Sequence, residues 1–412
     1  MKTFITIFII GFYMLSVQAQ ENNPIPDILA QGDDLVQKII KDRQKYEVQI
    51  SYSPIYRDAR GEPRIETYTW SVDPDKYFYP ASTIKMPVAF FAVEKLNQLQ
   101  SDEIDLHTPI AFGSSGSPQH LVLYDTTALD NELTLAHLIK KVFLVSDNEA
   151  YNLLYAFCGQ KFINDQLKAK GYEDVKITHR VGAPGYSLED NRRSNPILFY
   201  KNDDILYIEP TKYNPLNYAQ IQKSDCIKGN GYFAKGELVK EPFDFCDKNF
   251  LSIPVLHQLI TAFVVPEAVD EEKRYDITQA QRQEILSFMG ERPQESMYPR
   301  YPEKYTDRYV KFFMYGDSDD LMPASVRIFN KVGYAYGYLT DVAYITDKNT
   351  GIEFILTATI HVNENGIYND NNYQYDKLGI PFLAKIGRLF YNYESSRSHG
   401  SLPQDILQLK YQ

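Results

Sequence analysis

In the first 72 residues the spacing of hydrophobic side chains changes from a helical period to a strand-like alternation. Residues 25–45 repeat apolar side chains near every 3.6 positions, which predicts a helix. Residues 47–52 and 65–72 alternate apolar and polar positions as strands do, with a turn cluster at 58–63 between them. The pattern predicts a helix followed by a β-hairpin.

The middle of the chain is helical wherever a period can be read. Its other stretches are polar and irregular or rich in Pro, Gly, Asn and Tyr, and are predicted loops: 178–200, 200–250 and 291–325. The predicted helices cover residues 82–100, 132–158, 252–265 and 276–290.

Strand patterns return near the C-terminus. They cover residues 327–332, 339–346 and 353–362, and a helix is predicted over 381–393. Strands thus lie at both ends of the chain with helices between them. This order predicts a sheet built from the two ends, with a helical lobe inserted in the middle.

The N-terminus has the pattern of a secretory signal. Lys2 precedes an apolar run at residues 4–17, and Val17-Gln18-Ala19 provides small residues before a cut near Gln20. The run is short for a bilayer span, and no cysteine lies near the cut. We expect residues 1–19 to be removed and the mature protein to be periplasmic or secreted, without membrane attachment, and monomeric.

The composition limits the kinds of ligand and partner that this protein is expected to bind. The net charge of −11 argues against nucleic acid, and the seven His are scattered without ligand spacing, so we expect neither a metal nor another cofactor. The 33 Tyr are many. They fit either core packing with polar handles or a surface that binds sugars or peptides.

Three cysteines leave the disulfide pattern open. Cys226 and Cys246 have polar neighbours, lie 20 positions apart and can pair. Cys158 lies in an apolar helical run, which favours a buried free thiol.

Ser82-Thr83-Ile84-Lys85 opens the first predicted helix of the middle region. Residues three apart share a helix face, and the positive helix end favours developing negative charge. A lysine near that end can lose its proton and act as base toward the serine hydroxyl. The competing interpretation is an N-cap serine with a solvated lysine.

Ser146-Asp147-Asn148 comes 64 positions later, between two helical runs. Here a second serine can carry a proton to a leaving group, and the Asn148 amide can hold a substrate carbonyl and the Lys85 ammonium. The alternative is an ordinary N-cap cluster.

Lys331-Val332-Gly333 starts a strand-like run. Lys331 can hold Ser146 and polarise the site, and Gly333 permits close approach of a substrate backbone. The backbone N–H groups of Tyr334 and Ser82 can together form an oxyanion hole. The alternative is an edge lysine before a turn.

The three motifs together resemble those of class A β-lactamases and the related D-alanyl-D-alanine peptidases. Their flanks are similar as well, and the resemblance covers roughly residues 25–200 and 322–395. The similar flanks are residues 133–139, 148–154, 331–337 and 340–345.

The resemblance implies an α/β (α+β) fold with an antiparallel sheet from both chain ends, flanked by helices, plus a central all-helical lobe. The sheet lobe would comprise residues 20–79 and 322–412. The helical lobe would comprise 80–321, carrying Ser82 and Ser146, with an extended insertion at about 200–320.

The resemblance also implies roles for the motif residues. Ser82 would be the acylated nucleophile, Lys85 the base and Ser146 the proton shuttle. Asn148 would contact the substrate amide, and Lys331 would be the electrostatic partner. The substrate would be a β-lactam or a cell-wall peptide, and no cofactor would be needed.

The sequence departs from this family at two points. The family's Glu-x-x-Leu-Asn loop is absent from residues 178–191, where Glu189 is the nearest carboxylate. Glu189 can replace the missing glutamate or be a loop charge paired with Arg192 or Arg193. The second departure is Val332, which stands where the family has a hydroxyl that helps to hold the substrate carboxylate.

Three functions remain open. The first is an exported serine hydrolase that acylates Ser82 with an amide or ester. The second is a peptidase-like enzyme whose penicillin adduct deacylates slowly. The third is a non-catalytic ligand-binding module with a degenerate site, which should retain its ligand when Ser82 is changed to Ala.

Overall fold

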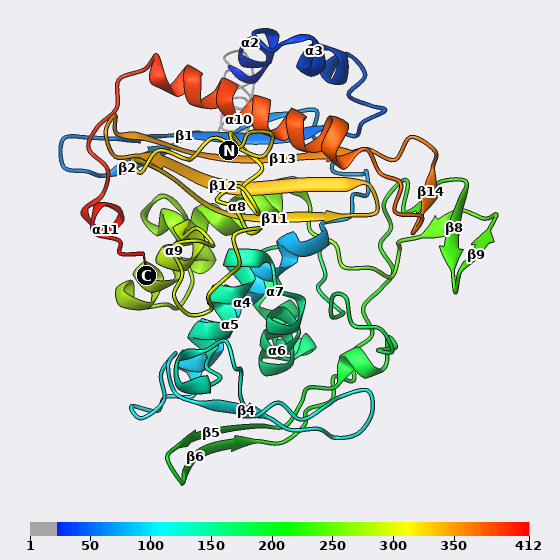
Figure 1. The fold of residues 1–412 in the computed structure, drawn as a ribbon, viewed down its shortest axis with the longest axis vertical. Coiled ribbons are helices and arrows are strands. Elements are labelled where there is room, and N and C mark those ends of the chain that lie inside the picture. The colour runs from blue at the N-terminus through cyan, green and yellow to red at the C-terminus, as the bar shows by residue number, and fades with distance from the viewer. Residues whose placement is uncertain (1–22, 412) are drawn as a thin grey trace, which may run out of the picture.

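The computed structural model describes residues 23–411 (Figure 1). The predicted signal peptide, residues 1–19, lies outside the described residues. Within the described range no helix combines the length and apolar character needed to cross a membrane.

The main sheet joins the two ends of the chain. Its strand order is β11-β12-β13-β1-β2, and β3 also pairs with β1. All of these pairings are antiparallel, as Gln49 opposite Thr359 illustrates for β1 and β13. The bounds are β1 (Gln49–Arg57), β2 (Pro63–Ile65), β3 (Tyr68–Trp70), β11 (Val326–Ala335), β12 (Tyr338–Asp347) and β13 (Ile352–His361).

Helices cover both faces of this sheet. α2 (Ile25–Ala30), α3 (Asp34–Lys41) and α10 (Ile380–Ser395) lie on one face, and α8 (Ile253–Val264) lies on the other with the helical lobe beyond it (Figure 1). β12 and β13 are buried along nearly their whole length because each face packs on a separate apolar core. The predicted α/β (α+β) class with an antiparallel sheet from both chain ends is confirmed.

The helix predicted over 25–45 is two helices. Gly32 lies between them, and the Asp33 carboxylate accepts the Val36 N–H and so caps α3. A period alone does not show such a break, because α2 and α3 both bury their apolar positions.

The helical lobe is built around α4, which is buried on all sides. Its Phe90 ring stacks on Phe263 of α8 with 3.8 Å between centroids. The helices of this lobe are α4 (Lys85–Gln98), α5 (Leu135–Val145), α6 (Asn148–Cys158), α7 (Gln160–Ala169) and α9 (Gln279–Gly290). Short helical turns are η1 (Ala81–Ile84), η2 (Leu129–Asn131), η3 (Asp190–Arg192), η4 (Pro266–Ala268) and η5 (Glu271–Lys273). Near the C-terminus lie η6 (Tyr375–Gly379) and α11 (Gln404–Leu407).

The central lobe is not all-helical as expected, because it also contains small sheets that the sequence pattern did not indicate. Most of their strands are two to four residues long, too short for an alternation to be read, and the two longer strands, of sequence ILFYK and DILYIE, do not alternate. One sheet is β4 (Ile110–Phe112), β5 (Ile197–Lys201) and β6 (Asp204–Glu209). The others are β7 (Ile227–Lys228) with β10 (Phe243–Asp244), and β8 (Gly231–Ala234) with β9 (Glu237–Val239) and β14 (Ile367–Tyr368).

The insertion that carries β7 to β10 is cross-linked by a disulfide. Cys226 and Cys246 form a disulfide, and Cys158 is a buried free thiol. β8 pairs in parallel with β14, so the insertion lies beside the loop that follows β13, at the right of Figure 1. The open question about these cysteines is thus answered by a bond between Cys226 and Cys246.

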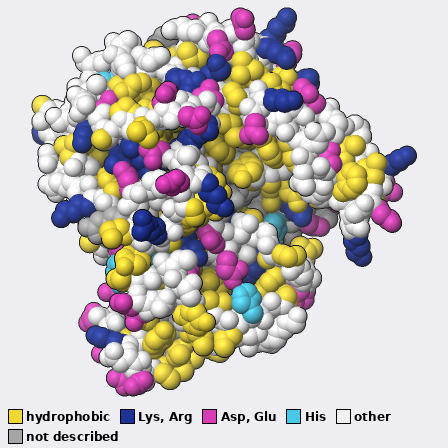
Figure 2. All heavy atoms as spheres, in the orientation of Figure 1, with side chains coloured by type: hydrophobic (Ala, Val, Ile, Leu, Met, Phe, Trp, Pro, Cys, Tyr) yellow, Lys and Arg dark blue, Asp and Glu magenta, His cyan; other side chains and the backbone are white. Residues whose placement is uncertain are grey.

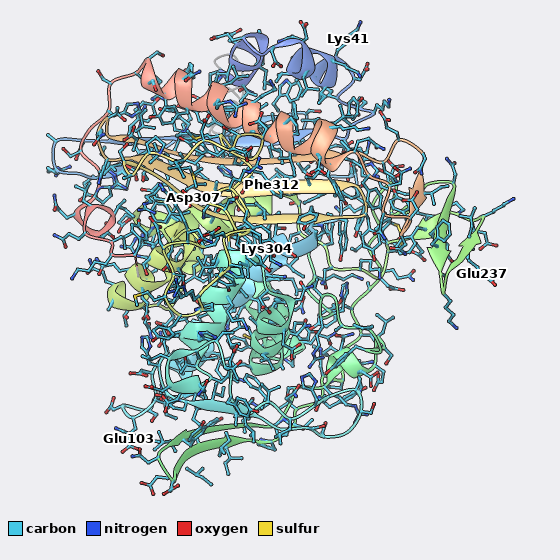
Figure 3. All side chains as sticks on the ribbon, in the orientation of Figure 1. Lys41, Glu103, Glu237, Lys304, Asp307 and Phe312 are labelled. Carbon is cyan, nitrogen blue, oxygen red and sulfur yellow. A yellow bond between two sulfur atoms is a disulfide. The ribbon has the colours of Figure 1, made fainter. Side chains whose placement is uncertain are left out.

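Residues 291–325 have no regular structure but are anchored in the interior. Lys311 Nζ donates to Met289 O at 2.7 Å and to Asn330 Oδ1 at 2.8 Å, and Asn330 Nδ2 donates to Asp341 Oδ1 at 2.7 Å. Asn330 Nδ2 of β11 donates to Val310 O at 2.9 Å, and the centroid of the Phe312 ring lies 6.1 Å from that of Tyr334 in β11; Figure 3 labels Phe312 together with Lys304 and Asp307 of the same segment. The segment therefore forms one wall next to β11.

Candidate active site

Ser82 lies in the turn η1, immediately before α4. Ala81 beside it has φ 47°, a left-handed conformation that is costly for an alanine and that concentrates at functional sites. Ser82 is half-buried, and among residues 23–411 its Oγ has no hydrogen-bond partner. The hydroxyl is thus free to meet a ligand.

Strand β11 lies unusually close to η1. A Cβ at Gly333 would be 2.6 Å from Pro80 O and 2.8 Å from Ser82 N, so only glycine permits this contact. The sequence suggested that Gly333 makes room for a substrate. In the structure the backbone that lies against Gly333 is the protein's own turn, and the contact fixes Ser82 relative to β11.

Lys85 opens α4, and its side chain is buried. Its Nζ donates to Ser146 O and to Asn148 Oδ1 at 2.6 Å each, and lies 3.3 Å from Ser146 Oγ. Burial lowers the pKa of Lys85 to about 7, although the Asp147 carboxylate opposes the shift. A substantial fraction of this amine is therefore neutral at neutral pH.

Ser146 ends α5 in a left-handed conformation, with φ 59°. Its Oγ lies 2.8 Å from Lys331 Nζ and 3.3 Å from Lys85 Nζ. The strained backbone thus holds one hydroxyl between two lysines, as a proton carrier requires.

Lys331 comes from the middle of β11 and is almost fully buried. Besides Ser146 Oγ, its Nζ contacts Val332 O at 2.8 Å. Burial, and secondarily the nearby Lys85 charge, hold the pKa of Lys331 well below its usual range.

Asn148 begins α6 and is exposed apart from its bond to Lys85. The helix is capped by Asp147, whose carboxylate accepts the Ala150 N–H at 2.9 Å. The capping interpretation of this motif therefore holds for Asp147, whereas Asn148 and Ser146 contact the lysines.

Tyr334 completes the arrangement through its backbone. Ala335 and Tyr338 close a two-residue hairpin whose turn residues, Tyr336 and Gly337, have φ 55° and 82°. These are type I′ values, and the closing pair of such a turn exchanges hydrogen bonds. By alternation the Tyr334 N–H points away from β12, toward η1. The Ser82 and Tyr334 amides therefore border the same space.

A cleft of about 650 Å³ opens at this point, and Ser82, Ser146 and Asn148 lie in its wall. The cleft lies where the sheet layer meets the helical lobe. Figure 2 shows hydrophobic side chains, a class that includes tyrosine, in yellow between these two parts. Its aromatic lining is Tyr79, Tyr309, Tyr334, Tyr336, Tyr373 and Tyr375. Four of these, Tyr79, Tyr309, Tyr373 and Tyr375, lie outside every element that periodicity predicted, and only the high Tyr content pointed to these four.

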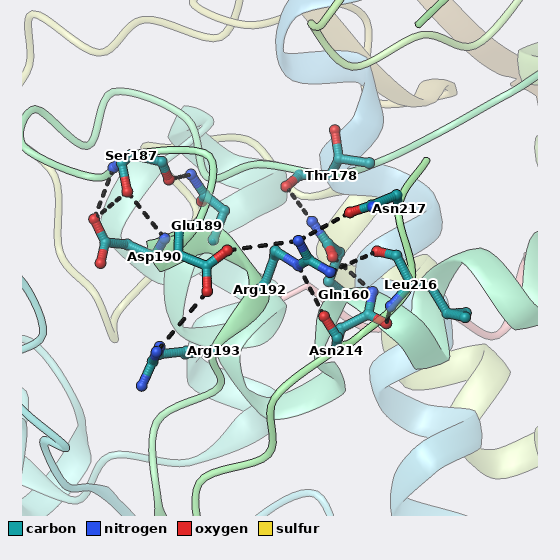
Figure 4. A network of polar contacts seen from close by, with 11 residues as sticks. Gln160, Thr178, Ser187, Glu189, Asp190, Arg192, Arg193, Asn214, Leu216 and Asn217 are labelled. Carbon is teal, nitrogen blue, oxygen red and sulfur yellow. Dashed lines mark hydrogen bonds and ion pairs between the residues drawn. The ribbon is translucent and has the colours of Figure 1, made fainter. Parts of the chain in front are cut away.

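Glu189 does not line this cleft. Its carboxylate lies 3.5 Å from Arg192 and 3.9 Å from Arg193, and it borders a separate cavity (Figure 4). Asn152 is bonded to the backbone of Val181, accepting from its N–H and donating to its C=O. Of the two interpretations of Glu189, the paired loop charge is the one that the structure shows.

Val332 faces away from the cleft. Its side chain is buried in the core between the sheet and α10. It adds no hydrogen-bond donor to the site.

Comparisons with known proteins agree with the motif analysis. The sequence profile of the Beta-lactamase enzyme family matches residues 35–203. No curated protein matches the chain. The match confirms the β-lactamase-like character that the motifs indicated.

Similar solved structures are β-lactamases. The one from Sphaerobacter thermophilus has 15% identity over 88% of this chain and 96% of its own, with a TM-score of 0.44. That from Xanthomonas campestris has 13% identity over 86% and 97%, with 0.45. The class A β-lactamase from Clostridium kluyveri has 13% identity over 87% and 97%, with 0.45.

Proposed function

We propose that this β-lactamase-like chain is a serine hydrolase that forms an acyl-enzyme on Ser82. The observation that carries the proposal is the amine of Lys85, one turn from an unbonded serine hydroxyl. The Lys85 amine is buried, donates to two oxygen acceptors and has a pKa lowered to about 7. A solvated lysine beside an N-cap serine would have none of these properties.

In the acylation step the neutral Lys85 amine takes the proton of Ser82 Oγ. The oxygen attacks the carbonyl carbon of an amide or ester, and a C–O bond forms. The carbonyl oxygen becomes an oxyanion, for which the N–H groups of Ser82 and Tyr334 are the donors.

The leaving group then receives a proton from Ser146. Ser146 Oγ, placed between the two lysines, donates its proton to the departing nitrogen or oxygen and is reprotonated by Lys85. The carbon–leaving-group bond breaks, and Lys85 returns to its neutral form. Lys331 keeps the Ser146 hydroxyl in position, and Asn148 holds Lys85.

Hydrolysis of the acyl-enzyme is the slow step of this proposal. Among the described residues no carboxylate lines the cleft, and Glu189 is paired with arginines elsewhere. This favours the slow deacylation of the second candidate, a peptidase-like enzyme that holds a β-lactam adduct for a long time. The Cys226–Cys246 bond supports an exported protein, periplasmic or secreted.

Intact-mass spectrometry of the folded protein tests the proposal. Benzylpenicillin, its methyl ester and an alkyl fluorophosphonate are added over minutes to hours, with S82A as control. We expect an adduct on Ser82 that persists with the β-lactams and is absent from S82A. An adduct that clears within minutes would contradict slow deacylation. No labelling of the folded protein would exclude Ser82 as nucleophile and leave a binding module.

A further inference from the structure

Within residues 23–411, the walls of the Ser82 cleft carry no charged side chain. They consist of six tyrosines, three asparagines, two serines and small or aliphatic residues. The contrast within the molecule is sharp, because a cavity of similar size, about 660 Å³, is bordered by His137, Lys140 and Glu284. The absence of charge is therefore a property of this cleft and not of the whole surface.

The cations nearest to Ser82 are already engaged. Lys331 is about 1% exposed and donates to Ser146 Oγ and Val332 O, so it lies beneath the wall and not in it. Lys85 donates to Ser146 and Asn148. A bound carboxylate would have to leave water and displace these contacts, at a cost of several kcal/mol if it stayed unpaired.

Arg180, next to the lining residue Val181, is also buried, and only part of its guanidinium is hydrogen-bonded, because its Nη1 has no partner among the described residues. Arg180 is about 5% exposed, lies over the rings of Tyr155 and Tyr186 at 5.3 and 4.4 Å, and donates to Arg193 O. It does not line the cleft. With Val332 facing the core, no Lys or Arg side chain among the described residues lines the cleft to replace the missing carboxylate contact beside Lys331.

Exposed tyrosine rings, and not charged groups, are the main features that the cleft wall offers to a ligand. Tyr309 and Tyr334 are the most open, about 42% and 55% exposed. Tyr334 lies edge-on to Tyr375 with centroids 5.6 Å apart, and Tyr375 is 5.2 Å from Tyr373. Such a row offers stacking faces to a flat ring, and pairs of this kind contribute about 0.5–1.5 kcal/mol each beyond buried area.

We infer that the substrate of this site has no carboxylate beside its scissile bond and presents an uncharged, ring-bearing acyl group to the tyrosines. This inference rests on the proposed function, because it names the substrate class of the Ser82 acylation. The neutral side-chain amides of Asn369 and Asn371 fit the polar part of such a molecule.

Two matched pairs of substrates test the inference. The first is a chromogenic cephalosporin as the free acid and as its methyl ester. The second is p-nitrophenyl phenylacetate and p-nitrophenyl acetate, each corrected for its rate with hydroxide. We expect at least tenfold faster acylation of Ser82 by the methyl ester, and a several-fold preference for phenylacetate.

Y309A and Y309F separate the ring from the hydroxyl. Y309A should lose most of the phenylacetate preference, whereas Y309F should keep it. Equal or faster acylation by the free acid would overturn the inference, and a methyl-ester preference without a ring preference would overturn the role of the tyrosines.

The neutral fluorophosphonate distinguishes these failures from failure of the proposed function. If it labels Ser82 while the acid reacts as fast as the ester, the hydrolase stands and the substrate class is wrong. If it does not label the folded protein, the proposed function fails and this inference fails with it.

Discussion

Lys85 and Lys311 are two buried lysines with the same shift and different surroundings. Burial lowers the pKa of each to about 7. Lys311 is enclosed by Met289 O and Asn330 Oδ1, and Asn330 in turn holds Asp341. Lys85 instead contacts Ser146 and Asn148, both of which line a cleft.

The comparison shows that a lowered pKa does not identify a functional lysine. Desolvation acts on both amines alike, but only Lys85 is near hydroxyls that a ligand can reach. Lys311 holds the 291–325 segment against β11. Its two hydrogen-bond acceptors, Met289 O and Asn330 Oδ1, cannot pass a proton to a substrate. The geometry around the amine decides between catalysis and structure.

Replacing Lys85 gives the largest expected effect. K85M should lower the rate of Ser82 acylation by about 1000-fold, since the base is lost. The rate of adduct formation with the fluorophosphonate measures this. Circular dichroism should show a folded protein, and a K85M protein that acylates at the normal rate would remove Lys85 from the mechanism.

Ser146 is expected to matter less, and in a manner that depends on the leaving group. S146A should slow acylation by penicillin methyl ester about 100-fold, because the amide nitrogen needs a proton. The fluorophosphonate, which releases fluoride, should be affected much less. An equal loss with both probes would indicate that Ser146 only positions Lys331.

K311M sharpens the comparison from the other side. It leaves the Met289 carbonyl and Asn330 Oδ1 without their donor, so we expect a loss of about 2 kcal/mol in the free energy of unfolding. Urea denaturation measures the loss. The acylation rate of the folded protein should stay within about threefold of the unmodified protein, and a large rate loss would tie Lys311 to the site.

The pH profile of acylation should follow the Lys85 amine. Because burial places its pKa at about 7, the rate should rise roughly tenfold per pH unit below that value and level off above it. Because Lys85 and Lys331 interact, the apparent pKa read from the profile is a property of the two lysines together. A rate that still rises toward pH 10 would mean an unshifted base.

The same shift sets the sign of a stability change. Between about pH 7 and the ordinary value of 10.5 the unfolded chain binds more protons at Lys85 than the folded protein does. The contribution of this group to stability therefore rises with pH over that window. K85M should remove this part of the slope.

The smallest expected effect is that of E189Q. Glu189 is half-exposed and pairs with Arg192 and Arg193, so its replacement should change stability by less than about 0.5 kcal/mol. The lifetime of the penicillin adduct should not change, as mass spectrometry can show. A longer lifetime in E189Q would return Glu189 to the deacylation step.

Strong hydrophobic periods and the three motifs gave the sequence predictions that agree with the structure. The strands β11 to β13, the helices α5, α8 and α9, and the sheet from both chain ends are among them. The contact of Ser146 with Lys331 was also expected, because both motifs serve one chemical step.

Other features have no local signal in the sequence. Gly333 approaches Ser82 only when β11 lies against η1, and the tyrosine wall is assembled from residues near 79, 309, 334 and 375. The pairing of Glu189 depends on where two neighbouring arginines point. These are tertiary facts, and a single sequence shows only that the residues exist.

The pairing of β1 with β13 also has a consequence for how the protein acquires its activity. Gln49 meets Thr359, about 310 positions along the chain, and such distant contacts form slowly because a long loop must close first. Ser82, Lys85 and Ser146 are all synthesised long before Lys331 and Tyr334. The growing chain would therefore carry its nucleophile in an inert form, and chemical competence would arrive in one late step, when the last strands dock.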